Sequence, residues 1–123
     1  MKTLIMVAAH KPYWMPEDAA YLPLFVGAAG KETPAPGWQR DDAGDNISHK
    51  NPTFCELTGH YWLWKNTDAE LYGLCHYRRH FAMGLPFGGK KQQVLTSGRL
   101  AKLLERCDVL VPKKRHYYIE TNY

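Results

Sequence analysis

Hydrophobic residues in this chain form short continuous runs between polar loops, a pattern typical of strands buried in a parallel sheet. Four runs predict strands, at residues 3–9, 22–28, 71–75 and 108–112. The runs at 3–9 and 71–75 have no polar alternation, so we expect both strands to be covered on both faces. Pro23 confines the second strand to an edge or places the proline at its start.

Residues 51–66 predict a long helix before the third of these strands. Asn51 can cap it with Pro52 at the first helical position, and Thr53 with Glu56 offers a capping box as an alternative start. One helical face carries four large side chains at spacings of three and four, namely Phe54, Leu57, Tyr61 and Trp64. We expect the rest of the domain to cover that face.

A second, amphipathic helix is predicted at residues 95–106, between the runs at 71–75 and 108–112. A strand, a crossover helix and a further strand are the mark of a parallel sheet. The sequence therefore predicts an α/β fold, a mostly parallel sheet with flanking helices, as one domain over residues 1–123. Because such a sheet would end abruptly after 112, we expect this domain to be the N-terminal part of a longer one.

Composition supports a folded domain and narrows the classes of partner. The 123 residues are 45% hydrophobic and 13% aromatic, enough for a real core. A formal net charge of +4 with cations at strand ends does not favour nucleic-acid binding. Cys55, Cys75 and Cys107 show no CxxC spacing, which predicts reduced core thiols in a cytoplasmic protein. The apolar run at 4–9 is too short for a signal peptide or a membrane span.

Cations follow three of the predicted strands, at residues 10–11, 76–80 and 113–115. Because the carboxyl ends of parallel strands share one rim, we expect these side chains to form a site for an anionic diphosphate. Two other interpretations stay open. His10 and Lys11 can be plain loop residues, and Arg78 or Arg79 can be paired to a nearby acid. His76 can be a general acid or base, a donor to phosphate, or a hydrogen-bonded core residue.

A long polar loop at residues 30–47 carries the other candidate chemistry. Asp41, Asp42 and Asp45 surround Gly44 and can present carboxylates to a divalent metal or to sugar hydroxyls. The spacing is not that of an EF-hand. Asx turns alone also explain aspartates in a loop, so this alternative stays open.

Several longer motifs resemble a bacterial family of domains of unknown function associated with glycosyltransferases of capsular and exopolysaccharide biosynthesis. The matching pieces cover most of the chain and are AAHK, YLPLFVGAAG, DDAGDNISHKN, CELTGHYWLWKN, YGLCHYRRHF and DVLVPKK. The resemblance implies a GT-A-like nucleotide-diphospho-sugar transferase fold, related to the Rossmann fold. It also implies a nucleotide-sugar donor and a glycan or lipid-linked acceptor, with peripheral contact to the inner face of the membrane.

The resemblance also assigns roles to residues. It places His10 and Lys11 near the nucleotide, and His76, Arg78 and Arg79 near the diphosphate. The residues expected near donor or acceptor are Asp41, Asp42, Asp45 and Asn46. We take His76 and Asp45 as the candidate catalytic residues.

Two departures from the family pattern bear on these expectations. Family members are usually longer than this chain. GT-A enzymes commonly hold manganese or magnesium through an Asp-x-Asp motif, whereas the corresponding strand here ends in HYRR. The expected divalent cation is therefore either held by the aspartates of the 30–47 loop or replaced by the cationic side chains. The alternative to a transferase is a non-catalytic module that binds an anionic glycan or a phosphorylated ligand.

Overall fold

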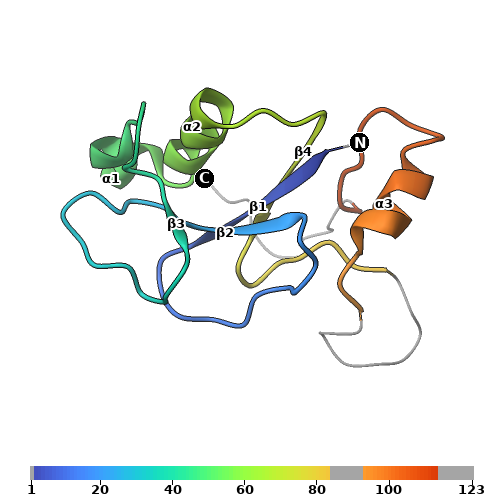
Figure 1. Cartoon of the computed structure of the whole chain (residues 1–123), viewed down its shortest axis with the longest axis horizontal. Coiled ribbons are helices and arrows are strands. Elements are labelled where there is room, and N and C mark those ends of the chain that lie inside the picture. The colour runs from blue at the N-terminus through green and yellow to red at the C-terminus, as the bar shows by residue number, and fades with distance from the viewer. Residues whose placement is uncertain (1, 84–92, 114–123) are drawn as a thin grey trace, which may run out of the picture.

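The computed structural model describes residues 2–83 and 93–113. They form an α/β fold whose four-stranded sheet is parallel throughout, with strand order β3-β2-β1-β4 (Figure 1). The strands are β1 (Thr3–Ala9), β2 (Tyr21–Phe25), β3 (Gln39–Arg40) and β4 (Leu71–His76). The helices are η1 (Ser48–Lys50), α1 (Asn51–Phe54), α2 (Leu57–Asn66) and α3 (Ser97–Leu103). The predicted fold class is confirmed.

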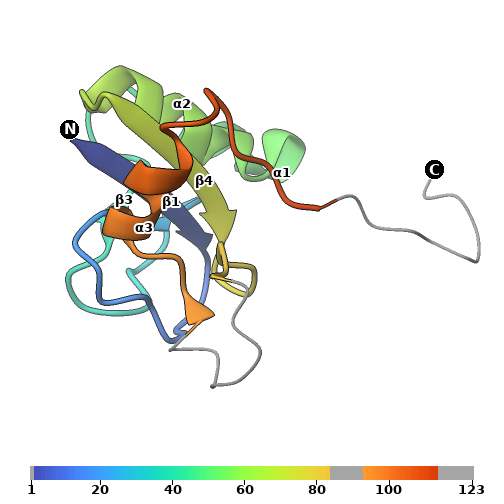
Figure 2. The ribbon, with the colours of Figure 1, turned by 90° about the vertical axis from the view of Figure 1, so that its right-hand side faces the viewer.

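Strand β1 lies inside the sheet between β2 and β4, which explains its unbroken hydrophobicity. Its alternate residues serve two separate clusters. Ile5, Val7 and Ala9 pack with Leu100 of α3, whereas Met6 and Ala8 face the side of the sheet that α2 covers. The result is three layers, with α2 and α3 on opposite faces of the sheet (Figure 2).

Helix α2 approaches the sheet closely because its inward face is small where the contact is tightest. The buried residues of α2 are Thr58, Gly59, Trp62 and Leu63. A Cβ added at Gly59 would lie 2.7 Å from Val26 Cγ1, 3.0 Å from Met6 Sδ and 3.1 Å from Leu24 Cδ2. Contacts that short require the helix or the strands to move.

The predicted helix at 51–66 is broken in two at Cys55, whose φ is 51°. The side-chain amide of Asn51 donates to the Cys55 carbonyl at 2.8 Å and to Thr58 Oγ1 at 3.1 Å, which fixes the bend. The break disrupts the predicted covered face. Phe54, Leu57 and Trp64 are 43%, 54% and 67% exposed, so the expectation that they are covered is wrong for the described structure.

Two predicted strands also differ from the structure. Strand β4 lies at the edge of the described sheet, and Tyr72 and Leu74 are exposed rather than buried. The run at 108–112 forms no strand, and its Val109 and Val111 are exposed. Both errors have one cause, since apolar runs show that a segment suits a sheet but not which neighbours cover it.

The prediction of core cysteines fails at two of three positions. Cys55 and Cys107 are exposed, and only Cys75 on β4 is partly buried. Burial raises the pKa of the Cys75 thiol to about 12, so this group stays protonated and unreactive at neutral pH. Among the described residues, no helix is both long and apolar enough to cross a bilayer.

We expect Gly59→Ala to destabilise the fold by about 1–3 kcal/mol, because the added methyl overpacks the contact between α2 and the sheet. Gly98→Ala on α3 is the matched control, since its Cβ would meet nothing within 4 Å. Ala is also the better helix former, so this control should leave stability unchanged or slightly higher. Denaturant unfolding of both variants measures the difference, and equal stabilities would contradict the close approach of α2.

Candidate functional site

The strand order places a crevice at the carboxyl ends of β1 and β4. From β1 the chain proceeds outward through β2 to β3 and then returns to add β4 on the other side of β1. Open α/β sheets bind ligands at such a reversal of strand order, outside the carboxyl ends of the strands. His10 and Lys11 follow β1 directly, and the segment 76–80 ends and follows β4. The structure therefore brings these two predicted cationic segments together.

Tyr77 is the centre of this basic cluster, which we define as His10, Lys11, His76, Arg78 and Arg79. The Tyr77 ring is 1% exposed. The ring centroids of His10 and His76 lie 5.5 Å and 4.3 Å from it, Lys11 Nζ lies 6.0 Å away, and Arg78 Cζ lies 5.6 Å away. An aromatic face attracts cations, so the phenol ring helps hold neighbouring positive groups in place.

The chain turns sharply at the end of β4. The Arg79 backbone N–H donates to the His76 carbonyl at 2.8 Å, and these two residues form an isolated antiparallel bridge. Alternation along a strand would have separated Arg78 from Arg79. Because the strand ends at His76, that restriction does not apply, and both exposed guanidinium groups stand at one turn.

The positive charge of this cluster is not neutralised within residues 2–83 and 93–113. The single ion pair in those residues joins Arg40 to Asp42, so no described acid pairs with Arg78 or Arg79. Burial lowers the pKa of His76, and the nearby charges of Arg78, His10 and Arg79 lower it further, against an opposing effect of Glu56. His76 is therefore neutral at pH 7. Its Nδ1 is 3.4 Å from the Arg78 backbone N–H, which leaves Nε2 as the protonated donor.

An open groove of about 1140 Å³ extends from the basic cluster along the side of β4. Arg78, Arg79 and Lys113 contribute cations to its lining, and Leu74, Leu95 and Leu103 contribute apolar walls. Lys113 is thus the one described residue of the third predicted cationic segment, since residues 114 and 115 lie outside the described ranges.

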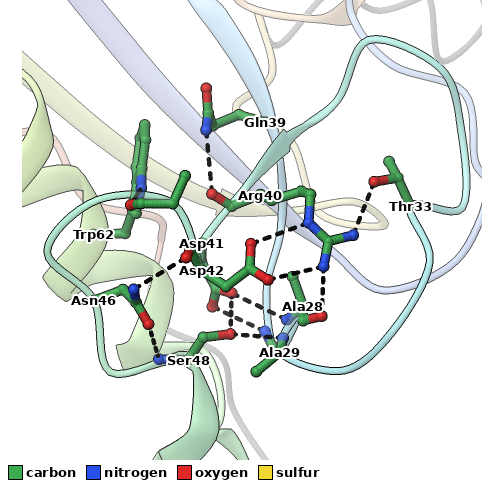
Figure 3. Close-up of polar contacts among 12 residues, drawn as sticks. Ala28, Ala29, Thr33, Gln39, Arg40, Asp41, Asp42, Asn46, Ser48 and Trp62 are labelled. Atoms are coloured by element: carbon green, nitrogen blue, oxygen red, sulfur yellow. Dashed lines mark hydrogen bonds and ion pairs between the residues drawn. The ribbon is translucent and has the colours of Figure 1, made fainter.

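The aspartates of the 30–47 loop stand at the opposite end of the rim and are used by the fold. Asp41 is fully buried. Its carboxylate accepts hydrogen bonds from the backbone N–H groups of Gly27 at 2.8 Å and Ala28 at 3.0 Å. It also accepts from the hydroxyls of Ser48 and, at 2.7 Å, Thr58. Figure 3 shows the bonds from Ala28 and Ser48. With every accepting position occupied and no exposure, the Asp41 carboxylate is engaged by the protein itself and does not offer its oxygens to a ligand.

Asp42 is likewise engaged. Arg40 binds it through two hydrogen bonds, of 3.0 Å and 2.8 Å, and this contact lowers the pKa of the Asp42 carboxyl (Figure 3). Asn46 donates to the carbonyls of Asp42 and Gly44, and its side-chain oxygen accepts from the Ser48 N–H. The loop therefore shows the local turn bonding that was the alternative to a ligand site.

Asp45 does not meet His76. It is exposed, accepts a hydrogen bond from the Tyr61 hydroxyl at 2.8 Å and is tied to Asn66 at the end of α2. Its loop follows β3, which lies three strand spacings, or about 14 Å, from β4. His76 ends β4, whereas Asp45 lies beside the last turn of α2 and fastens the loop to that helix, so the structure does not bring the two candidate catalytic residues together.

The described acids do not fit a metal. No three His, Cys, Asp or Glu side chains of residues 2–83 and 93–113 are grouped as ligands. The oxygens of Asp41 and Asp42 are occupied by hydrogen-bond donors of the protein itself, and cations would need those same lone pairs. A metal bound between these aspartates would first have to break the network that holds β2, β3 and α2 together.

Sequence reasoning missed three residues of this architecture, namely Tyr77, Ser48 and Thr58. Period-two alternation in a continued strand would place Tyr77 on the face away from His76, whereas the turn brings their ring centroids to 4.3 Å. The burial of Thr58 could have been predicted from the sequence. Positions 58, 59, 62 and 63 form a second helical stripe, of small and large residues, and this is the stripe that faces the sheet.

Comparisons with known proteins agree with this fold. Residues 4–123 match the model of a family described as "Domain of unknown function (DUF4422)". A solved structure described as the apo form of WbbM, a bifunctional glycosyltransferase, is similar with a TM-score of 0.62 and 42% identity. The similarity covers 73% of this chain but 16% of that one, so the chain spans a small part of that enzyme. A search of curated protein sequences gives no match.

We expect Asp41→Asn to lower the free energy of unfolding by about 3 kcal/mol, because an amide turns one accepting oxygen into a donor that faces other donors. Asp42→Asn is the control of the same chemistry at a partly exposed site, and its effect should be markedly smaller. Chemical denaturation compares the two. Similar losses for both variants would show that the Asp41 network does not hold the fold.

Proposed function

The chain belongs to the DUF4422 family, and from this premise we propose that it is a glycosyltransferase domain that takes its sugar from a nucleoside-diphosphate donor. One observation carries the proposal. Cations from the ends of β1 and β4 converge on Tyr77 at the reversal of strand order, with no described acid to neutralise Arg78 or Arg79. The similarity to WbbM, itself a bifunctional glycosyltransferase, supports the reaction class.

The chemistry of sugar transfer explains the need for such a cluster. The bond between the anomeric carbon and the diphosphate oxygen breaks, a bond to an acceptor hydroxyl oxygen forms, and the electron pair leaves with the diphosphate. Negative charge therefore grows on the leaving group. Fixed cations stabilise that charge more in the transition state than in the bound donor, which lowers the barrier.

Each member of the cluster has a part that suits its chemistry. The guanidinium groups of Arg78 and Arg79 offer paired, permanently charged donors to phosphate oxygens, and Lys11 adds a point charge. His10 lies beside the same ring, on the side of the nucleotide in this proposal. His76 contacts the diphosphate as a neutral donor through Nε2, because its Nδ1 accepts from the Arg78 backbone. We assign Asp41, Asp42, Asp45 and Asn46 to shaping the rim.

The finer parts of the proposal rest on the resemblance of the motifs. They are a glycan or lipid-linked acceptor, a role in surface polysaccharide biosynthesis, and a location in the cytoplasm. Manganese or magnesium remains part of the proposal only with ligands other than Asp41 and Asp42. Donor binding measured with and without manganese tests this point, since cations of the protein alone would make binding independent of the metal.

We expect Arg78→Ala and Arg79→Ala each to weaken binding of a nucleoside-diphosphate sugar by about ten- to hundredfold, the cost of a lost charged hydrogen bond. Arg99→Ala on the exposed side of α3 is the matched control and should bind normally. Calorimetry with the whole protein measures all three. Unchanged binding in both cluster variants would remove the diphosphate from this site, and tight binding without any transfer or hydrolysis would favour a binding module instead of an enzyme.

Donor binding should also strengthen as the pH falls below about 6.5, the ordinary pKa of histidine. His76 is neutral in the free protein down to a lower pH than usual, because burial and the neighbouring cations disfavour its charged form. A bound diphosphate favours that charged form, so protonation and binding support each other. His76→Gln keeps an N–H donor but cannot be protonated, and its affinity should vary less between pH 7 and pH 5. Identical pH dependence in both proteins would exclude His76 from contact with the donor.

A further inference from the structure

Glu56, the residue that precedes α2, carries a carboxylate that the described fold does not use. The residue is exposed, and although it occupies the N-cap position of α2, its side chain makes no capping hydrogen bond. The single ion pair in the described part of the chain joins Arg40 to Asp42, so no described cation is paired with Glu56. In this respect Glu56 differs from Asp41 and Asp42, whose oxygens are occupied by donors of the protein.

The register of the sheet places His76 on the face that α2 covers. His76 pairs with Ala8, and paired residues of neighbouring strands point their side chains to the same face of a sheet. Ala8 belongs to the cluster under α2, together with Met6 and Trp62. His76 therefore ends β4 on the helix side of the sheet.

The first turn of α2 lies over this end of the sheet. Helix α2 runs back toward the amino ends of the strands, where β4 begins, so α1 and the start of α2 lie at their carboxyl ends (Figure 2). A Cβ at Gly59 would lie 3.0 Å from Met6 Sδ. Glu56 is one turn nearer the rim than Gly59, by about 4.5 Å, and Ala8 is about 6.6 Å nearer the rim than Met6. Glu56 is thus close to the level of Ala8 and of its partner His76.

The electrostatics agree with this placement. Burial lowers the pKa of His76 and of His60, and the Glu56 carboxylate opposes that effect at both imidazoles. A carboxylate repels the phosphates of a donor, so its place beside the basic cluster is unsuited to holding the diphosphate. It suits the neutral reactant of sugar transfer, the acceptor hydroxyl, which must lose its proton.

We propose that Glu56 is the general base of the transfer, an inference that rests on the proposed function. Its carboxylate takes the proton of the acceptor O–H, and the freed electron pair of that oxygen forms the bond to the anomeric carbon. The bond from that carbon to the diphosphate oxygen breaks, and its electron pair leaves with the diphosphate beside Arg78 and Arg79. Glu56 then passes the proton to water. It takes the catalytic place expected for Asp45, which lies beside the last turn of α2.

A purely structural role for Glu56 is the alternative. An acid at the start of a helix stabilises the helix through its dipole. That role would alter the melting temperature of a variant but not the turnover of its folded molecules, and the two roles are therefore separable by experiment.

Binding and turnover of the whole protein test the proposal. The probes are UDP-glucose, UDP-N-acetylglucosamine and GDP-mannose, with water as the acceptor, and release of the nucleoside diphosphate measures turnover. The variants are Glu56→Gln, which keeps the shape of the side chain, and Glu56→Ala, which leaves room for added formate as a substitute base. Glu105→Gln is the matched control, since Glu105 is an exposed acid just after α3, on the opposite face of the sheet. Melting temperatures verify that each variant is folded.

We expect Glu56→Gln to bind the donor within about twofold of the unchanged protein but to lower kcat by about 10²- to 10⁴-fold, the effect of a lost general base. Formate should restore part of the turnover of Glu56→Ala, and Glu105→Gln should behave like the unchanged protein.

Equal turnover in Glu56→Gln, an equal loss in Glu105→Gln, or a loss in Glu56→Ala that formate does not restore would overturn the base and leave the proposed function standing. Donor binding without turnover in the unchanged protein would also overturn the base, in favour of a binding module. If none of the three donors binds, the proposed function itself fails, and the role of Glu56 fails with it.

Discussion

The buried carboxylate of Asp41 joins parts of the chain that the sheet alone would not hold together. It follows β3, and it accepts from two backbone N–H groups just beyond β2 and from hydroxyls in η1 and α2. A charge in the interior is tolerated only when its lone pairs are satisfied, and here four donors satisfy them. Strand β3 is two residues long, so its position depends on this network more than on its ladder to β2.

The rim formed by the carboxyl ends of the strands carries acidic groups at one end and cationic groups at the other. At β2 and β3 the acids are satisfied by donors of the protein, and Asp42 is neutralised by Arg40. At β1 and β4 the cations of the basic cluster have no described acid partner, and they surround a phenol ring that fills the space beneath them. A fold that satisfies its own acids and leaves its cations available is suited to an anionic ligand, and the reversal of strand order decides where that ligand would sit.

The sequence predicts the class of this fold well because β1 and α2 are determined by local patterns. Continuous hydrophobicity required a central strand, and the cations after β1 and β4 were correctly expected to share a rim. The wrong predictions concern which side chains are buried by neighbouring elements. Phe54, Leu57 and Trp64 have the spacing of a core stripe, yet the small pair of Thr58 and Gly59 faces the sheet, since only a small surface allows the close approach that the Asp41 network requires.

The role of the aspartates was open in the sequence for a different reason. Asp41, Asp42 and Asp45 are the same residue type in one loop. The hydrogen-bond partners that distinguish them include residues far along the chain, such as Thr58 and Asn66. Composition cannot tell a carboxylate that the protein itself occupies from one that it offers to a ligand. The bend at Cys55 was equally invisible, because it depends on the side chain of Asn51 reaching two later residues.

The pairing of β1 with β4 also has a consequence for how the chain is made. Thr3 pairs with Leu71, so the most hydrophobic segment leaves the ribosome long before its second neighbour exists. Until then β2 can protect one edge of β1, and the other edge stays open to wrong partners. Such distant contacts slow folding and extend the time in which nascent chains aggregate. Folding of this protein therefore depends on β1 staying protected until β4 has been made.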